Sequence, residues 1–289
     1  MAETTEAADR VALDEWYCVG AVDEIPLGGT KATTLLETRI AMTRLAAGMV
    51  DVRNPAGEEL PVRLRFGYVW TSLGRPNHDI FAIPEYDEPD RRNLNAASIG
   101  VRASAPRAVE NFLDLGHLPI VHVNYLGIEP RAEIKPYDIA IAPDGAEVVA
   151  TRCRVYQPQA SLVATEGYDV EYVYRVPHPY CAVLYKSSAI DAQRSDAIAI
   201  FVQPVDQERS IAHLLGSVLD DRSTDKEIRA FQQLIFGQDK PILENQIPAR
   251  LPLDPRAEMP ARVDATSTMY RRWLRERGVR YGTIPVAAA

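Results

Sequence analysis

Four residues near the middle of the chain could hold and tune a metal ion. Asn111, Asp114 and His117 are spaced three apart, which on a helix places their side chains on one face. His122 follows five residues after His117, and Pro119 between them is expected to bend or stop the helix and return the second imidazole toward the first. Two converging neutral imidazoles, with a carboxylate from elsewhere in the chain, are the ligands of a two-histidine, one-carboxylate iron site.

A bare pair of histidines at this spacing has a simpler explanation, since two histidines at helix ends often bond only to free carbonyl groups. The asparagine and aspartate at matching positions favour the metal site instead.

The run N-x2-D-x2-H-x4-H that begins at Asn111 resembles the mononuclear-iron motif of Rieske non-haem iron oxygenase α subunits. The wider segment 104–127 is similar to the branch of that family that performs oxidative N- and O-demethylation. The resemblance implies that His117 and His122 bind Fe(II). It also implies that Asp114 passes electrons to the metal and that Asn111 lies beside it.

A third ligand is implied by the same resemblance, a carboxylate far downstream on a C-terminal helix. The segment 236–246 resembles the start of that helix and nominates Asp239, with Glu244 as the alternative more than one turn further on. Taken alone, Asp239 would be explained as a carboxylate stabilised by the dipole at a helix N-terminus.

Ligands for a Rieske cluster are missing from this sequence. The cluster needs two cysteines and two histidines, which this family spaces as C-x-H and C-x2-H. No histidine stands two or three residues after any of the cysteines, which are Cys18, Cys153 and Cys181. Yet 16–20 resembles the opening of the Rieske domain and 65–74 resembles its closing strand. We therefore expect a truncated Rieske-like β domain without a [2Fe-2S] cluster.

Composition indicates an ordinary globular enzyme. The 289 residues include 32 basic and 40 acidic side chains, a net charge of -8 that argues against nucleic acid as a partner. Three scattered cysteines suggest reduced thiols. Residues 1–10 contain no apolar signal segment. The longest apolar run, near 197–202, is too short to span a membrane. We expect a cytoplasmic protein without membrane contact.

Strand patterns divide the chain into two unequal parts. Segments 36–44 and 62–72 read as strands of a small β domain, and the acidic, proline-containing stretch 84–90 reads as a linker. We place the boundary near Asn93, which gives a truncated Rieske-like domain at 1–92 and a mononuclear iron catalytic domain at 93–289.

Period-two alternation then predicts seven strands with short, turn-rich connections, which favour an antiparallel sheet. Helices are expected from Ser104 and from the capping box Thr224–Glu227, the second breaking near Gly237. The fold class is α+β, matching the helix-grip (START-like) domain that the resemblance implies. The strands are expected at 98–103, 137–141, 147–157, 168–176, 181–188, 197–205 and 211–218.

Electrons for an oxygenase would have to come from another protein, because the chain has no G-x-G-x-x-G or P-loop motif for binding its own nucleotide cofactor. The chain resembles cluster-less catalytic subunits such as that of bacterial methylxanthine N-demethylase systems. The resemblance implies O2 as co-substrate, a small aromatic or heterocyclic substrate, and N-demethylation that releases formaldehyde. It further implies a Rieske-containing reductase or companion oxygenase subunit, in a trimer-based homo- or hetero-oligomer.

Three other hypotheses remain open at this point. The chain could be a non-catalytic scaffold subunit of a hetero-oligomeric oxygenase. It could be an O-demethylase or ring hydroxylase of the same family. The two histidines and one carboxylate would also suit zinc used hydrolytically, although no general base accompanies them.

Overall fold

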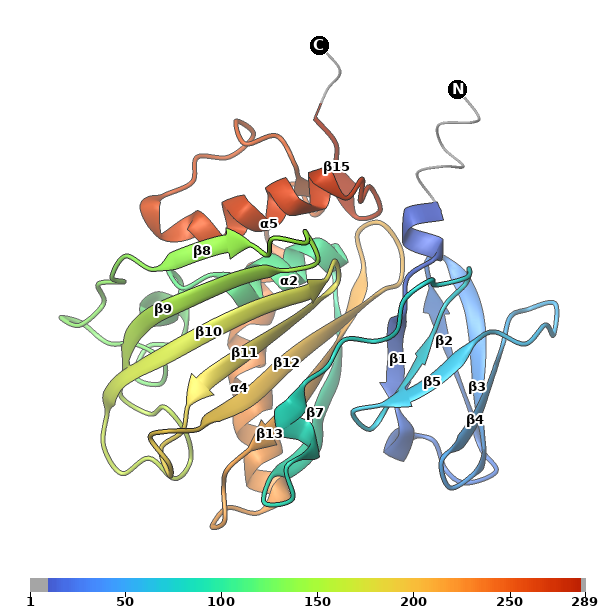
Figure 1. The fold of residues 1–289 in the computed structure, drawn as a ribbon, viewed down its shortest axis with the longest axis horizontal. Coiled ribbons are helices and arrows are strands. Elements are labelled where there is room, and N and C mark those ends of the chain that lie inside the picture. The colour runs from blue at the N-terminus through green and yellow to red at the C-terminus, as the bar shows by residue number, and fades with distance from the viewer. Residues whose placement is uncertain (1–9, 287–289) are drawn as a thin grey trace.

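The computed structural model describes residues 10–286, and its centre is a seven-stranded antiparallel sheet (Figure 1). The strands lie in the order β7-β13-β12-β11-β10-β9-β8, so sequential neighbours pair throughout except where β7 closes on β13. Their bounds are β7 Arg92–Val101, β8 Asp138–Ile141, β9 Val148–Gln157, β10 Tyr168–His178, β11 Cys181–Ser187, β12 Ser195–Pro204 and β13 Ser210–Val218. The predicted seven-stranded antiparallel sheet is confirmed.

Strand β7 begins six residues earlier than expected. In the first half of this strand, the buried residues Leu94 and Ala96 are separated by polar residues. With so few apolar residues, the period-two alternation is hard to recognise in the sequence. Pairing with β13 from Arg92↔Val218 onward supplies the hydrogen bonds that make this polar segment a strand.

The small N-terminal region contains two three-stranded sheets, β1-β6-β5 and β2-β3-β4 (Figure 1). The expectation of one strand over 62–72 is wrong, because Phe66 and Gly67 both have positive φ and form a tight hairpin turn. The chain there makes two strands instead of one. The six strands are β1 Tyr17–Ala21, β2 Thr30–Leu35, β3 Thr38–Ala46, β4 Met49–Arg53, β5 Val62–Arg65 and β6 Tyr68–Thr71.

The helices lie against the large sheet (Figure 1), and the long helix α4 carries Asp239. Thr224 and Glu227 form the expected capping box at its start. The expected break near Gly237 is wrong, since α4 continues through both Gly237 and Pro241. The α-helices are α2 Ala105–Leu113, α3 Leu118–Val121, α4 Asp225–Glu244 and α5 Ala265–Glu276. The 3-10 turns are η1 Val22–Glu24, η2 Pro84–Asp87 and η3 Arg262–Asp264. Two short strands, β14 Leu251–Pro252 and β15 Thr283–Ile284, form a parallel pair.

Side-chain hydrogen bonds fix α4 to the edge of the sheet. Arg229 Nε donates to the carbonyl of Asn95 and Gln233 Nε2 donates to the carbonyl of Ala96, each at 2.8 Å. The helix is thereby held at a fixed position along β7, which determines where its inward-facing residues lie.

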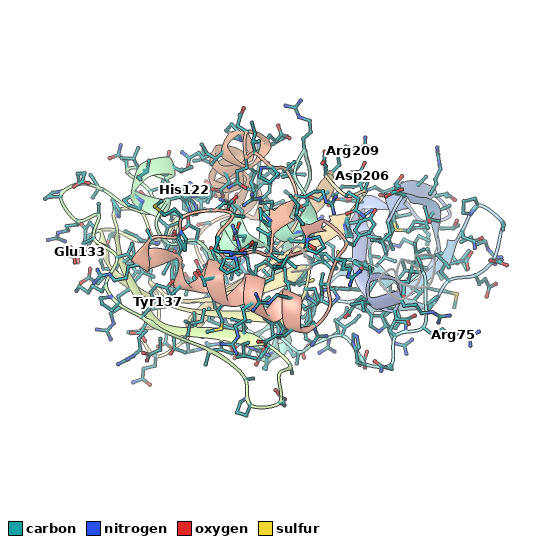
Figure 2. The ribbon with its side chains drawn as sticks, turned by 90° about the horizontal axis from the view of Figure 1, so that it is seen from above. Arg75, His122, Glu133, Tyr137, Asp206 and Arg209 are labelled. Carbon is teal, nitrogen blue, oxygen red and sulfur yellow. The ribbon has the colours of Figure 1, made fainter. Side chains whose placement is uncertain are left out.

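Figure 2 shows the two parts end to end, with Arg75 in the small region and His122 in the large one. Among residues 10–286, no helix combines the length and the apolar content needed to cross a membrane. The prediction that residues 1–10 contain no signal segment stays a prediction, because residues 1–9 lie outside the described part of the chain.

Candidate metal centre

The chain around the first histidine is bent rather than helical. Helix α2 ends at Leu113, and Asp114 is its C-cap with an extended ψ of 127°. Asp114 Oδ1 accepts a hydrogen bond from Gly116 N at 2.8 Å, a local turn that competes with continuation of the helix. The expectation that Asn111, Asp114 and His117 share one face of a continuous helix is therefore wrong, although the bend still brings His117 next to Asp114.

Pro119 starts a short helix instead of ending one. It lies in the first turn of α3, where its missing N–H has no partner to lose, and His117 and His122 cap the two ends of that helix. Gly127 then packs directly on Pro119, since a Cβ there would lie 2.4 Å from Pro119 Cα. This close approach holds the turn in which Leu126 N donates to His122 O at 2.9 Å.

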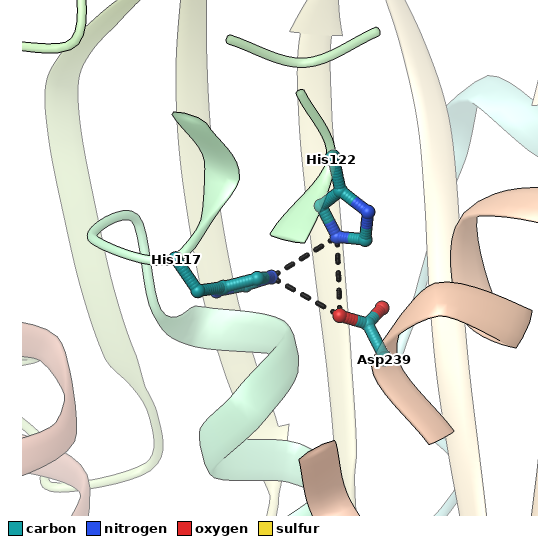
Figure 3. A group of neighbouring side chains, drawn as sticks. All are labelled: His117, His122 and Asp239. Atoms are coloured by element: carbon teal, nitrogen blue, oxygen red, sulfur yellow. Dashed lines mark hydrogen bonds and ion pairs between the residues drawn. The ribbon is translucent and has the colours of Figure 1, made fainter. Parts of the chain in front are cut away.

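Asp239 from α4 completes a triangle of possible ligand atoms (Figure 3). The two histidine Nε2 atoms lie 3.1 Å apart. Asp239 Oδ1 lies 3.2 Å from His117 Nε2 and 3.1 Å from His122 Nε2. The structure thus brings together all three residues that the sequence nominated as metal ligands.

The triangle suits a metal ion better than a set of hydrogen bonds. With metal–ligand bonds of about 2.1 Å, adjacent ligands of an octahedral ion lie about 3.0 Å apart, close to the three observed separations. Asp239 Oδ1 is buried and accepts no hydrogen bond from the described residues, although both imidazoles are near enough for an ion pair. The three atoms therefore fit one face of a metal's coordination shell, and the remaining positions stay available for other ligands.

The other nitrogen of each imidazole is held by an outer partner. His117 Nδ1 lies 3.1 Å from Asp114 Oδ2, and His122 Nδ1 lies 2.8 Å from Gln238 Oε1. When each Nδ1–H donates to its oxygen, each Nε2 presents a lone pair toward the triangle. No motif in the sequence indicates Gln238, whose one signal is its place directly before Asp239.

Two carboxylates make the surroundings of His117 strongly negative. Burial by itself lowers the pKa of an imidazole, but Asp114 and Asp239 outweigh it and raise the pKa of His117 to about 9. Burial likewise opposes ionisation of Asp239, and the two imidazoles overcome it and lower the pKa of that carboxyl. A cation at the triangle would take the place of that proton.

Replacing Gln238 by leucine is expected to weaken metal binding by about 10- to 100-fold, because His122 then loses the acceptor that fixes its tautomer and ring orientation. Iron content after dialysis against graded chelator measures this. Lys226→Leu on the same helix is the control, since Lys226 is exposed near the start of α4 and far along the helix from the triangle. Equal iron retention by both variants would contradict the role of Gln238.

A cavity opens beside the triangle. It encloses about 910 Å³ of empty space, including its open mouth, and Asn111 borders it together with the three ligand candidates. Tyr172 and Tyr174, two residues apart on β10 and so on one face of the sheet, line the cavity. Phe112 and Phe231 add two more aromatic rings, so the lining suits a flat, mainly apolar molecule.

The alternative third ligand and two further histidines of the catalytic part lie elsewhere. Glu244, the alternative third ligand, accepts from the backbone N–H of Arg102 at 3.0 Å and pairs with Lys240. His213 is buried in the sheet, where Ser98 Oγ and Gln203 Oε1 bond its ring, and His178 lies at the end of β10. None of these three residues belongs to the candidate site.

Comparison with known proteins identifies the family of this chain. Residues 101–280 match the family model described as vanillate O-demethylase oxygenase C-terminal domain. The chain is 47% identical over 281 residues to the probable methylxanthine N7-demethylase NdmC of Pseudomonas sp. (strain TJI-51), covering 96% of this chain and 98% of that protein. It is 26% identical over 215 residues to methylxanthine N1-demethylase NdmA of Pseudomonas putida, covering 73% of this chain and 58% of that protein.

Solved structures share the fold. Pseudomonas putida CBB5 NdmA with caffeine superposes with a TM-score of 0.74 at 19% identity, covering 93% of this chain and 92% of that one. Dicamba monooxygenase bound to dicamba gives a TM-score of 0.72 at 16% identity, covering 92% and 97%. From the family model and the 47% identity, the chain belongs to the Rieske non-haem iron oxygenase family and is a monooxygenase-type oxidoreductase subunit of its demethylase branch.

Proposed function

We propose that this chain removes an N-methyl group from a methylxanthine-like heterocycle, at a mononuclear Fe(II) held by His117, His122 and Asp239. The single observation that carries the proposal is the triangle of ligand atoms at 3.1–3.2 Å beside an aromatic-lined cavity. The 47% identical relative is named as an N7-demethylase, which directs attention to the N7-methyl group.

Iron bound there would supply the activation of O2 through which this family hydroxylates a carbon atom. Overall, an N-methyl group, O2, two electrons and two protons give an N-hydroxymethyl group and water. The N-hydroxymethyl product then loses formaldehyde and leaves a ring N–H.

The chain's own residues prepare the site for this reaction. Asp114 and Gln238 hold the two imidazoles in the tautomer that presents Nε2. Asn111, 8% exposed, borders the cavity beside the ligand atoms and limits how a substrate lies there. Phe112, Tyr172 and Tyr174 keep water away from the methyl carbon.

Electrons enter through Asp114 in this proposal, from a Rieske centre carried by a reductase or companion oxygenase subunit. Asp114 has 27% of its side chain exposed and borders a second cavity with Asn111 and His117. Ile242 and Met259 on the same cavity are exposed apolar side chains, 46% and 97%, which a docked partner would cover. The three cysteines are buried, and none of them has a histidine two or three residues after it, as the cluster motifs of this family require.

The same proposal includes the organisation of the chain. Residues 1–92 form the truncated Rieske-like domain and 93–289 the catalytic domain. The subunit works in the cytoplasm within a trimer-based homo- or hetero-oligomer.

Reconstitution tests the proposed function. Purified protein, a Rieske-bearing reductase, NADH and air are incubated with 7-methylxanthine, and formaldehyde and xanthine are measured. We expect both products in equal amounts, together with iron near one per chain and no acid-labile sulfide in the anaerobically purified protein. Absence of formaldehyde from an iron-loaded protein with any methylxanthine would refute N-demethylation.

A scaffold without activity of its own is the competing explanation. It predicts that a hetero-oligomer containing this chain keeps its activity when Asp239 is replaced. The buried, otherwise unbonded Oδ1 of Asp239 argues against it, because an unused site gains nothing from a desolvated carboxylate.

A further inference from the structure

Two buried charged residues lie at the end of the substrate cavity remote from the metal centre. Helix α4 lines the cavity along one side from Ile228 to Asp239, three helical turns or about 16 Å. Asp196 Oδ1 accepts from Leu219 N at 2.8 Å, and Leu219 lies on the connection that leads from β13 into the N-terminus of α4. Asp196 is therefore near Ile228, whereas the triangle is near Asp239.

Lys186 stands beside Asp196 on the neighbouring strand. The two residues are direct partners across β11 and β12, so their side chains leave the same face of the sheet. Both line the cavity, and they are only 5% and 6% exposed.

Each of these side chains has hydrogen-bonding capacity left over. Lys186 Nζ donates to the carbonyl of Ala160, its one hydrogen-bond partner among residues 10–286, although an ammonium group has three donors. Asp196 uses Oδ1 for Leu219, and Oδ2 accepts no hydrogen bond within the described chain. Charged groups are rarely buried with unused capacity, because each costs desolvation energy that its partners must offset.

Burial has the expected effect on both groups. It lowers the pKa of Lys186 to about 8 against the opposing charge of Asp196, and it raises the pKa of the Asp196 carboxyl. A ligand that bonds to both groups would offset this desolvation.

We infer that Lys186 and Asp196 bind the lactam edge of the substrate, the ammonium donating to a ring carbonyl oxygen and Asp196 Oδ2 accepting the adjacent ring N–H. The inference rests on the proposed function and adds the specificity of the same site. A heterocycle with this edge would be held at one end of the cavity and would direct its opposite end toward the triangle. A methyl group on the lactam nitrogen would remove the N–H and meet a carboxylate.

Asp196→Asn tests the carboxylate selectively. Since Oδ1 is held by Leu219 N–H, the new amide group replaces Oδ2 and presents a donor to the ring N–H. Lys186→Met keeps the length of the side chain and removes all donors. Asp169→Asn is the matched control, because Asp169 is exposed and lies outside this cavity.

Binding is measured by calorimetry on anaerobic, Fe(II)-loaded protein with 7-methylxanthine, 1,7-dimethylxanthine and 3,7-dimethylxanthine. Wild type and D169N should bind at least one dimethyl compound about tenfold more weakly than 7-methylxanthine. D196N should bind 7-methylxanthine about 10- to 100-fold more weakly and lose the discrimination, and K186M should weaken all three compounds.

The discrimination ratio is taken within one preparation, so partly unfolded protein, which reduces the number of sites, does not imitate the effect. If wild type binds none of the compounds, the proposed function fails and this inference with it. If wild type discriminates and D196N discriminates equally, the assignment of the lactam edge is overturned while the proposed function stands.

Discussion

Asp239→Asn is expected to empty the metal centre. The change removes the negative charge from Oδ1, which lies 3.2 Å and 3.1 Å from the two imidazole nitrogens, and leaves two neutral ligands in a buried site. Changes to outer partners of a metal site typically cost 10- to 100-fold in affinity, so losing a ligand should cost more than about 100-fold. Iron per chain after gel filtration and formaldehyde formation in the reconstituted system are the measurements, and both should fall together.

Glu244→Gln is the matched control for this experiment. Glu244 lies on the same helix and was the alternative ligand, but its carboxylate bonds to Arg102 and Lys240. The Gln variant should therefore keep its iron. Full activity of a hetero-oligomer carrying D239N would instead favour the scaffold explanation.

Asp114→Asn is expected to have the second largest effect, on both iron affinity and electron entry. Asp114 accepts with both oxygens, from Gly116 N and from His117 Nδ1, and an amide has only one oxygen. If that oxygen stays with Gly116, the amide nitrogen donates to His117 Nδ1 and forces the proton onto Nε2, the nitrogen that should bind the metal. Iron affinity should fall about 10- to 100-fold, and turnover with the reductase should stay at least about 100-fold below wild type at saturating Fe(II).

Hydrogen peroxide separates the two roles of Asp114, because it supplies both the oxygen atom and the two electrons. Iron-saturated D114N should recover much of the wild-type yield with peroxide if its remaining defect is electron entry. Asp264→Asn is the control, since Asp264 borders the same second cavity but bonds to the backbone N–H of Ala261. Normal reductase-driven turnover of iron-saturated D114N would show that electrons do not pass through Asp114.

The two cavities next to the triangle suggest how the chain keeps the substrate apart from the path of the electrons. His117 and Asn111 border both cavities, and Asp239 borders the aromatic one, whereas Asp114 borders the other. In the proposed mechanism the substrate occupies the first cavity and the partner protein approaches along the second. Electrons would then reach the metal without passing through the space that the substrate fills.

Local sequence was sufficient for the elements that depend on local physics. Alternation located the strands of the large sheet, and the capping box located the start of α4 at Thr224. Local sequence gave a wrong prediction at Phe66 and Gly67, where two positive φ angles fold the one predicted strand into a hairpin. A second wrong prediction was a helix that continues through Asp114. The side chain of Asp114 accepts a hydrogen bond from Gly116 N, and the helix ends there.

The sequence by itself determined the chemistry that is available: two histidines and an aspartate in one short motif, a downstream acidic helix, and three cysteines without the histidines that a cluster needs. The tertiary structure decided which residues meet. It placed Asp239 rather than Glu244 at the triangle, brought Gln238 to His122, and paired Lys186 with Asp196 in one cavity. These contacts depend on how α4 is held along β7 and on strand register, both of which are set by long-range packing that no local pattern encodes.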